Sequence, residues 1–199
     1  MTRKTSTRRA LLLAITVAAT AVIAIGCTKN VVDKTTPFYY PPTSPNNVLK
    51  NLQTVYKNRD YDNYAPLLAT DFLFYFDPDT RVEKQLPEFW NKFEDSTHTS
   101  DVLKSGNVSD VRINLTYQPN GVPVNEVGHE RWLKVQVTDT FLEVDLKPEP
   151  GQNEGVTLQV DGQVQDFFFR KGKTEDDTLE TSPTSKNYYI VQWRDKGRN

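Results

Sequence analysis

The pattern of apolar and polar positions along the chain begins with helical spacing. Beyond residue 45, one apolar stripe is formed by Val48, Leu49, Leu52, Val55 and Tyr56. Because these residues recur every three or four positions, and Asn46 and Asn47 are good N-caps, a helix is expected to begin there. A second helix is expected to begin at Asp60 and to be kinked by Pro66, which has no backbone N–H to donate.

Strand-like alternation follows in an aromatic run at residues 71–76. One face of this expected strand carries Phe72, Phe74 and Phe76, and the other carries Leu73 and Tyr75. Residues 87–104 are expected to return to helix, since Pro87 suits a first helical turn. The polar run at 96–100 is expected to break this helix into two pieces.

From residue 111 onward, alternation predicts a series of antiparallel strands. They are expected at residues 111–117, 131–146, 156–170 and 188–194. In the second of these the apolar positions change parity between Asp139 and Leu142, which predicts a β-bulge and a bend. Asp161 and Gly162 are expected to form either a hairpin turn or another bulge. Helices followed by a bent antiparallel sheet predict an α+β fold with the helices packed on the concave face.

The first 26 residues have the three parts of an export signal peptide. A basic start is followed by apolar or small residues at 10–25 and then by Cys27. The basic residues are Arg3, Lys4, Arg8 and Arg9. The apolar run is shorter than the roughly 20 residues that span a bilayer, which favours cleavage over an uncleaved signal anchor.

The expected cleavage site, Ala24-Ile25-Gly26-Cys27, resembles the bacterial lipobox. The resemblance implies that Cys27 carries a diacylglyceryl thioether and becomes the acylated first residue of the mature protein. As the only cysteine, Cys27 cannot form an internal disulfide; a thiol left free by ordinary cleavage is the alternative. Two or three acyl chains anchor a protein stably in a membrane. By resemblance to enterobacterial sorting rules, Thr28 after the cysteine implies the outer membrane, with the protein facing the periplasm.

The predicted organisation is a signal peptide at residues 1–26, a lipidated tether at 27–45 and one folded domain at 46–196. The tether is rich in proline, which favours an extended chain. The aromatic triplet Phe38-Tyr39-Tyr40 within it is expected to pack back on the domain, because exposed rings in a row are unfavourable; a partner-binding motif is the alternative.

Charge argues against one class of partner. The whole chain has a formal net charge of −2, and the first 26 residues hold four basic and no acidic side chains, which leaves −6 for the remainder. An acidic domain repels a phosphate backbone, so no nucleic-acid partner is expected.

Three stretches resemble the NTF2-like superfamily, also called SnoaL-like. They are residues 48–61, residues 64–74, and residues 160–170 together with 189–195. The resemblance covers nearly all of residues 46–196 and implies a cone made of N-terminal helices on a strongly bent sheet. The superfamily includes isomerases, dehydratases, cyclases, transport adaptors and binding domains, so the fold alone assigns no function.

No catalytic constellation is visible along the chain. His98 and His129 lie far apart in polar surroundings, and no cysteine–histidine cluster exists, so no metal site is expected. The triplet at 172–174, Gly-Lys-Thr, imitates the end of a P-loop, but Phe167 stands where that motif needs glycine. Asp166 alternates with Phe167 and is expected to face solvent. No cofactor is expected.

Large rings are expected to line the inside of the cone. The candidate pocket residues are Phe74, Tyr75, Trp90, Phe93, Trp132, Phe168 and Trp193. Alternation allows only one of Phe74 and Tyr75 to face inward. The expected apolar cavity is ~300 Å³ or larger, enough for a small ligand, although an aromatic stripe that simply forms the core is the alternative.

The sequence thus predicts a membrane-anchored lipoprotein of the cell envelope with a non-catalytic binding domain. Its partner is expected to be a small apolar ligand or an envelope protein, and a homodimer through the sheet is a further expectation. The alternative function is an isomerase or lyase of the same superfamily that uses a buried Asp/Tyr pair.

Overall fold

The computed structural model of the protein describes residues 36–152, 154–174 and 186–198. The predicted signal peptide, Cys27 and residues 27–35 of the predicted tether lie outside these residues, as do residues 153, 175–185 and 199. Among the residues that are described, no helix has the length and apolar character needed to cross a bilayer.

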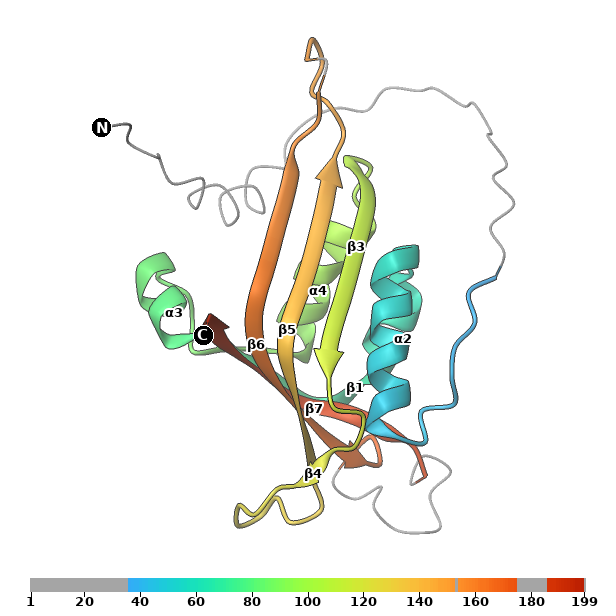
Figure 1. The fold of residues 1–199 in the computed structure, drawn as a ribbon, viewed down its shortest axis with the longest axis vertical. Helices are drawn as coiled ribbons and strands as arrows, with labels where there is room; N and C mark the ends of the chain where they lie inside the picture. The colour runs from blue at the N-terminus through green and yellow to red at the C-terminus, as the bar shows by residue number, and fades with distance from the viewer. Residues whose placement is uncertain (1–35, 153, 175–185, 199) are drawn as a thin grey trace.

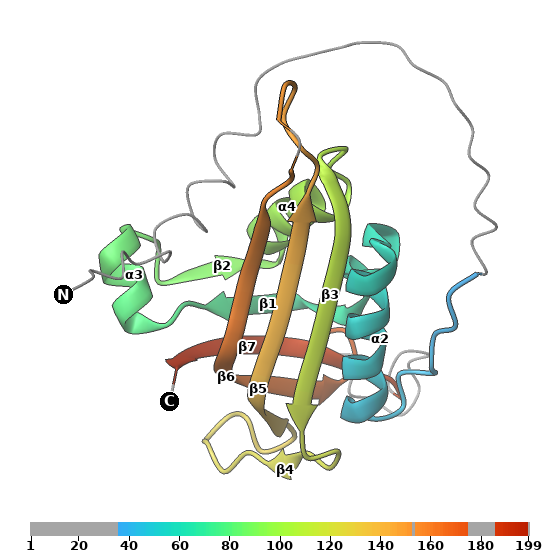
Figure 2. The same cartoon turned by 45° about the horizontal axis from the view of Figure 1, so that its top comes forward.

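A seven-stranded, strongly bent sheet forms the main body of the domain (Figures 1 and 2). Its strands are β1 (Leu68–Tyr75), β2 (Phe89–Asn91), β3 (Val108–Tyr117), β4 (Val122–Pro123), β5 (Leu133–Leu146), β6 (Thr157–Lys171) and β7 (Tyr188–Arg198). The order is β2-β1-β7-β6-β5-β3, with β4 paired to β5. The β1–β7 pair is parallel, so the sheet is mixed, and the expectation of a purely antiparallel sheet is wrong at this one pair.

Two helices lie on the concave side of the bent sheet. They are α2 (Pro45–Asn58), which packs mainly on β3, and α4 (Lys92–Leu103), which packs on β1 and β2 (Figures 1 and 2). A short helix, α3 (Pro78–Lys84), follows β1 outside this pair. The predicted α+β cone, with helices on the concave face of a bent sheet, is confirmed.

The first helix begins slightly earlier than expected. Ser44 is its N-cap, and the Ser44 side chain accepts a hydrogen bond from the Asn47 backbone, while Pro45 occupies the first turn. Asp60 caps the next segment as predicted, but that segment consists of two 3₁₀ turns, η2 (Tyr61–Asn63) and η3 (Ala65–Leu67), because Pro66 prevents a continuous helix.

The expected helix at 87–104 is confirmed over Lys92–Leu103, but its start at residue 87 and its break at 96–100 are wrong. Residues 89–91 form the edge strand β2, and α4 then runs without a break. Asn91 and Glu94 form a capping box that starts the helix, and Ser96 and Thr99 are buried inside it rather than forming a loop. The polar run at 96–100 predicted a break in the helix, but several polar side chains of α4 face the protein interior.

The predicted bend in the sheet is confirmed. The register of β5 against β6 shifts between Val137 and Thr140 and again between Thr140 and Leu142. On β6, Asp161 and Gly162 have no partner in the ladder, and Gly162 has a positive φ of 70°, so this dipeptide forms a bulge and not a hairpin turn.

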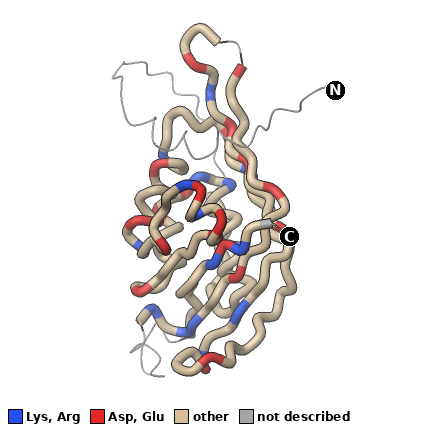
Figure 3. Tube along the Cα trace, turned by 90° about the vertical axis from the view of Figure 1, so that its left-hand side faces the viewer, with Lys and Arg blue, Asp and Glu red and all other residues tan. Residues whose placement is uncertain are grey.

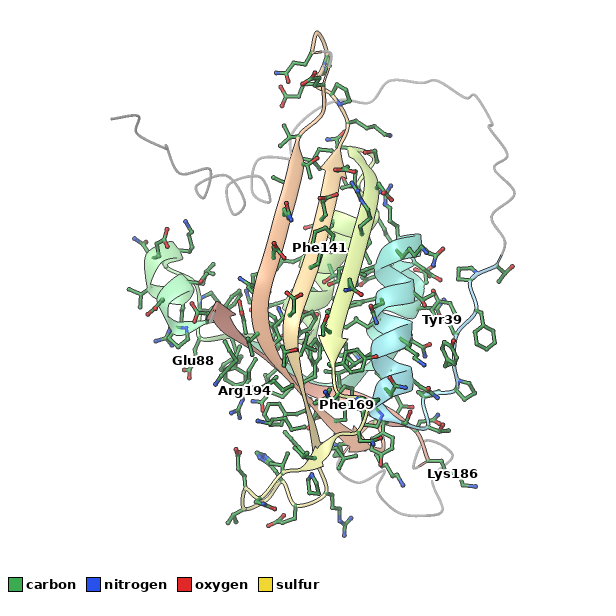
Figure 4. The ribbon with its side chains drawn as sticks, viewed as in Figure 1. Tyr39, Glu88, Phe141, Phe169, Lys186 and Arg194 are labelled. Carbon is green, nitrogen blue, oxygen red and sulfur yellow. The ribbon has the colours of Figure 1, made fainter. Side chains whose placement is uncertain are left out.

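The end of the predicted tether, residues 36–44, lies against the domain (Figures 1 and 4). Tyr39 donates a hydrogen bond to Asp60 at 2.6 Å, and the backbone of Tyr40 is bonded through both its N–H and its C=O to the Asn51 side chain at 2.8 Å. Phe38, in contrast, remains 69% exposed. The expected packing of the aromatic triplet is therefore confirmed for Tyr39 and wrong for Phe38.

Candidate binding site on the concave face

The sheet divides the seven predicted pocket rings between its two faces. Phe74, Trp90 and Trp193 face the concave side: Phe74 is the register partner of both others, and Trp193 belongs to the main core. Tyr75, Trp132 and Phe168 lie on the convex side, and Phe93 is 79% exposed. The prediction that these four line the pocket is wrong, because the side chains of a strand alternate and Phe93 lies on the solvent side of α4.

The convex rings form a row of their own. The Arg194 guanidinium, labelled in Figure 4, lies 5.8 Å from the centre of the Tyr75 ring and 4.7 Å from that of the Phe168 ring. The Trp132 ring stacks on the His129 ring, with 3.9 Å between the ring centres. Asp166 also lies on this side, 3.7 Å from Lys134. It is buried, so the expectation that it faces solvent is wrong, although it points away from the cone's interior. The homodimer through the sheet stays a prediction.

On the concave side the rings contact one another. Phe76 packs edge-to-face on Phe74 at 5.0 Å and on Trp90 at 4.7 Å, and Phe74 packs on Trp193 at 5.3 Å. His98, on α4, stacks on Trp90 at 4.1 Å. The apolar cavity of ~300 Å³ that was expected among these rings stays a prediction.

One hollow among the described residues lies away from these rings. It measures about 250 Å³ and lies between the 39–42 segment, α2, the 3₁₀ turns and the start of β7. Its walls are Tyr39, Tyr40, Pro42, Asn51, Asn63, Pro66, Leu67, Tyr188 and Tyr189.

Four polar atoms on the concave side are buried without a hydrogen-bond partner. They are His98 Nδ1, Thr140 Oγ1, Gln165 Oε1 and Trp193 Nε1. Thr140 is the register partner of the core residue Leu115, and Gln165 is the partner of Val137, which places both on the concave face. A buried polar group without a partner costs roughly 1–3 kcal/mol, so four on one face require an explanation.

A carboxyl group stands beside these atoms. Asp195 is opposite Gln165 in the β6–β7 ladder and two residues after Trp193, so it shares their face. Its carboxylate accepts a hydrogen bond from the Gly197 backbone at 3.0 Å. Burial, reinforced by the nearby Asp77 carboxylate, raises the pKa of Asp195 above its usual range, although the bond from Gly197 opposes this.

Another acid, Asp95, is buried in the first turn of α4. Asp95 is 6% exposed and accepts a hydrogen bond of 2.7 Å from the hydroxyl of the fully buried Tyr64. Burial raises the pKa of Asp95 to about 6, despite the opposing effect of this bond. Burial and the Asp95 charge likewise raise the pKa of Tyr64 and of its neighbour Tyr56.

Both acids carried signals that sequence reasoning missed. Asn91 and Glu94 are spaced as a capping box, which would have started α4 at the right place and put Asp95 in its first turn. Asp195 follows Trp193 at the strand period, so a concave Trp193 implies a concave Asp195. In the described part of the chain, no group of three or more His, Cys, Asp or Glu side chains is arranged to hold a metal ion.

We use the name concave site for Phe74, Phe76, Trp90, His98, Thr140, Gln165, Trp193 and Asp195. The fold and this site define a small α+β cone whose concave face combines aromatic rings, unpaired polar atoms and a carboxyl group. Charged residues of both signs are interspersed along the side of the molecule where α3 and the C-terminus lie (Figure 3).

Comparison with known proteins finds similarity in structure only. No family model matches the sequence, and no curated protein does. An NTF2-like superfamily protein from Salmonella enterica is similar over 76% of this chain and 87% of its own, with 10% identity and a TM-score of 0.47. A ketosteroid isomerase-like protein from Erwinia carotovora is similar over 74% and 88%, with 13% identity and a TM-score of 0.42.

A conserved protein from Planctomyces limnophilus is also similar, over 74% of this chain and 88% of its own, with 13% identity and a TM-score of 0.48. The likeness concerns the fold alone, and it transfers no ligand and no residue role to this chain.

Proposed function

We propose that this chain is a membrane-anchored lipoprotein of the cell envelope whose domain binds a small ligand at the concave site. The ligand has an apolar body and at least one hydrogen-bonding group. One observation carries the proposal: four buried polar atoms without a partner lie on the same face as a cluster of aromatic rings.

The rings and the polar atoms have complementary roles in this proposal. Phe74, Phe76 and Trp90 are only partly buried, so a ligand can reach them from solvent and displace their mutual contacts. Buried atoms on the same face, such as Gln165 Oε1 and Trp193 Nε1, then gain the partners that they lack. Such pairing favours the bound state, because the unpaired atoms are a cost that only the free protein bears.

A thermal-shift screen of small aromatic and alicyclic compounds tests this site. A ligand that binds only the native state, at 100 times its Kd, adds about 2.7 kcal/mol to the free energy of unfolding and raises the melting temperature. Replacing Gln165 with leucine is expected to stabilise the free protein by about 1 kcal/mol, because an unpaired acceptor disappears, and to reduce the shift that a bound ligand produces.

The exposed Gln159→Leu variant on the same strand is the matched control, and its ligand-induced shift should equal that of the wild type. If Gln165→Leu destabilised the free protein and left every ligand shift unchanged, the unpaired acceptor would have no part in binding.

A second candidate, an isomerase or lyase, is favoured by the buried pair of Asp95 and Tyr64. A carboxyl whose pKa is about 6 suits a general base at neutral pH, and Tyr64 is a hydrogen-bond donor beside it. Compounds that bind are to be followed by NMR for conversion over time. Conversion that stops in Asp95→Asn while binding persists would support this candidate; binding without conversion supports the binding domain.

The membrane anchor rests on the lipobox-like sequence and is tested at Cys27. The Cys27→Ser variant is expected to remain an unprocessed precursor or to leave the membrane fraction, because serine cannot form the thioether. Fractionation, apparent mass and labelling with a fatty acid are the measurements, and Thr28→Ser is the control that keeps the cysteine. A variant that was still processed to the same size and still sedimented with membranes would show that acylation at Cys27 is wrong.

A further inference from the structure

We infer that the ligand of the concave site carries a protonated amine, held by the Asp195 carboxylate and Gln165 Oε1 beside the aromatic rings. This inference rests on the proposed binding function and specifies the chemistry of the ligand.

The first argument is the kind of polar atom that lacks a partner. Gln165 is 6% exposed, and its unpaired atom is Oε1, which can only accept a hydrogen bond. Gln165 and Asp195 are register partners on adjacent strands, so their side chains stand next to each other on the same face. Two neighbouring acceptors are satisfied together by one group that donates several hydrogen bonds, and an ammonium donates up to three.

The second argument is charge. Asp77 and Asp195 both lie next to Gly197: a Cβ on Gly197 would stand 2.9 Å from Asp77 Oδ1, while the Gly197 N–H donates to Asp195. The Asp77 charge also disfavours ionisation of Asp195. Two neighbouring carboxylates repel each other, and a cation beside them relieves that repulsion. An anionic ligand would instead add a third negative charge.

The third argument is the aromatic surroundings. Trp193 shares its strand face with Asp195 and contacts Phe74, which in turn contacts Phe76, and Phe76 contacts Trp90. The faces of such rings attract cations within about 6 Å, most strongly where water is excluded. A neutral apolar ligand would pack on the rings equally well but would leave Gln165 Oε1 unpaired.

Three compounds with the same aryl body separate these possibilities: phenethylamine, 2-phenylethanol and 3-phenylpropanoate. Binding to the purified full chain is followed by tryptophan fluorescence, because Trp90 and Trp193 both line the site, and is confirmed by calorimetry. The ammonium is expected to bind at least about tenfold more tightly than the alcohol, as one added charge-assisted hydrogen bond allows, and the carboxylate is expected to bind most weakly.

Asp195→Asn is expected to lower the affinity for phenethylamine to that for 2-phenylethanol. The affinity for 2-phenylethanol itself should not change. Asparagine can still accept the bond from Gly197, so the fold is retained. Asp101→Asn, an exposed acid on α4, removes the same charge and should keep the preference for the amine.

The two proposals fail in different ways. If the alcohol or the carboxylate binds as tightly as the amine, the amine inference is overturned while the binding site stands. If Asp101→Asn loses the preference as fully as Asp195→Asn does, general attraction to an acidic protein explains it, and the inference is again overturned. If none of the three compounds binds at millimolar concentration, both the inference and the proposed site are overturned.

Discussion

Replacing Asp95 with asparagine is expected to stabilise the protein by about 2–3 kcal/mol at pH 7.5. The pKa of this carboxyl is about 6 in the native state against 3.8 as its ordinary value, and one unit corresponds to about 1.4 kcal/mol. Asp95 is almost fully buried, so water does little to reduce this cost. Asparagine keeps an oxygen that accepts the bond from Tyr64 and removes the charge that burial disfavours.

The pH dependence of stability follows from the direction of the shift. Because the native state holds the Asp95 proton more tightly than the unfolded chain does, the cost of the charge is fully present above pH 6. It is lost as the pH falls from about 6 to about 4, where the carboxyl is protonated in the native state. The free energy of unfolding of the wild type therefore approaches that of the variant as the pH falls from about 6 to about 4. Near pH 4 the stabilisation by asparagine disappears.

Urea unfolding of both proteins at pH 7.5, 6, 5 and 4 measures this difference. Other carboxyls titrate in the same range, among them Asp195 with a raised pKa and Asp60 with a lowered one, so only the difference between the two proteins isolates Asp95. The exposed Asp101→Asn, on the same helix, should change stability by less than about 0.5 kcal/mol. An Asp95→Asn protein that was less stable than the wild type at every pH would mean that the carboxylate is well compensated.

A buried charge that lowers stability is typical of a residue kept for activity. If asparagine stabilises the protein as expected, Asp95 gains weight as a functional residue, and the second candidate function with it. If asparagine does not stabilise the protein, the role of Asp95 is structural: its hydrogen bond with Tyr64 joins α4 to the 3₁₀ turns.

Strand faces and the bend could be read from the sequence because they depend on local alternation. The parity of Phe72, Phe74 and Phe76 placed β1 correctly, and the change of parity near Thr140 located the bulge. The parallel pairing of β1 with β7 could not be predicted in the same way, since it joins residues more than a hundred positions apart and leaves no periodic mark.

The candidate site was only partly predictable for a related reason. Phe74, Trp90 and Trp193 were found because they are large and apolar, whereas Asp95, Gln165 and Asp195 are polar residues that pattern analysis assigns to the surface. Their burial depends on which elements meet in space. Alternation could assign Phe168 to the opposite face from Phe167, but only the paired strands show which of the two faces is concave.

The second large effect is expected at Arg59, which ties α2 to the far end of α4. Its guanidinium donates to the carbonyl oxygens of Leu103 at 3.0 Å, Val108 at 2.7 Å and Ser105 at 2.5 Å. Two of these carbonyls belong to the end of α4 and the turn after it, where orphan acceptors and the negative end of the helix dipole both favour a cation. Removing the side chain leaves three carbonyls without this partner.

Arg59→Gly is therefore expected to destabilise the protein by about 3 kcal/mol, even though glycine relieves strain there. Arg59 has a φ of 53°, in the left-handed region that glycine adopts readily, so the backbone alone would gain from the change. Gln85→Gly is the matched control: Gln85 ends α3 with a φ of 55°, and its side chain is exposed.

This control should be stabilised by about 0.5 kcal/mol, since it keeps the relief of strain and loses no comparable set of bonds. Urea unfolding of the two variants separates the backbone effect from the guanidinium effect. Arg59→Lys keeps the charge but not the planar fork, and it should recover only part of the loss because one ammonium cannot reach three carbonyls as the guanidinium does. If Arg59→Gly and Gln85→Gly shifted stability in the same direction, the three hydrogen bonds would contribute little, and the junction of α2, α4 and β3 would depend on apolar packing alone.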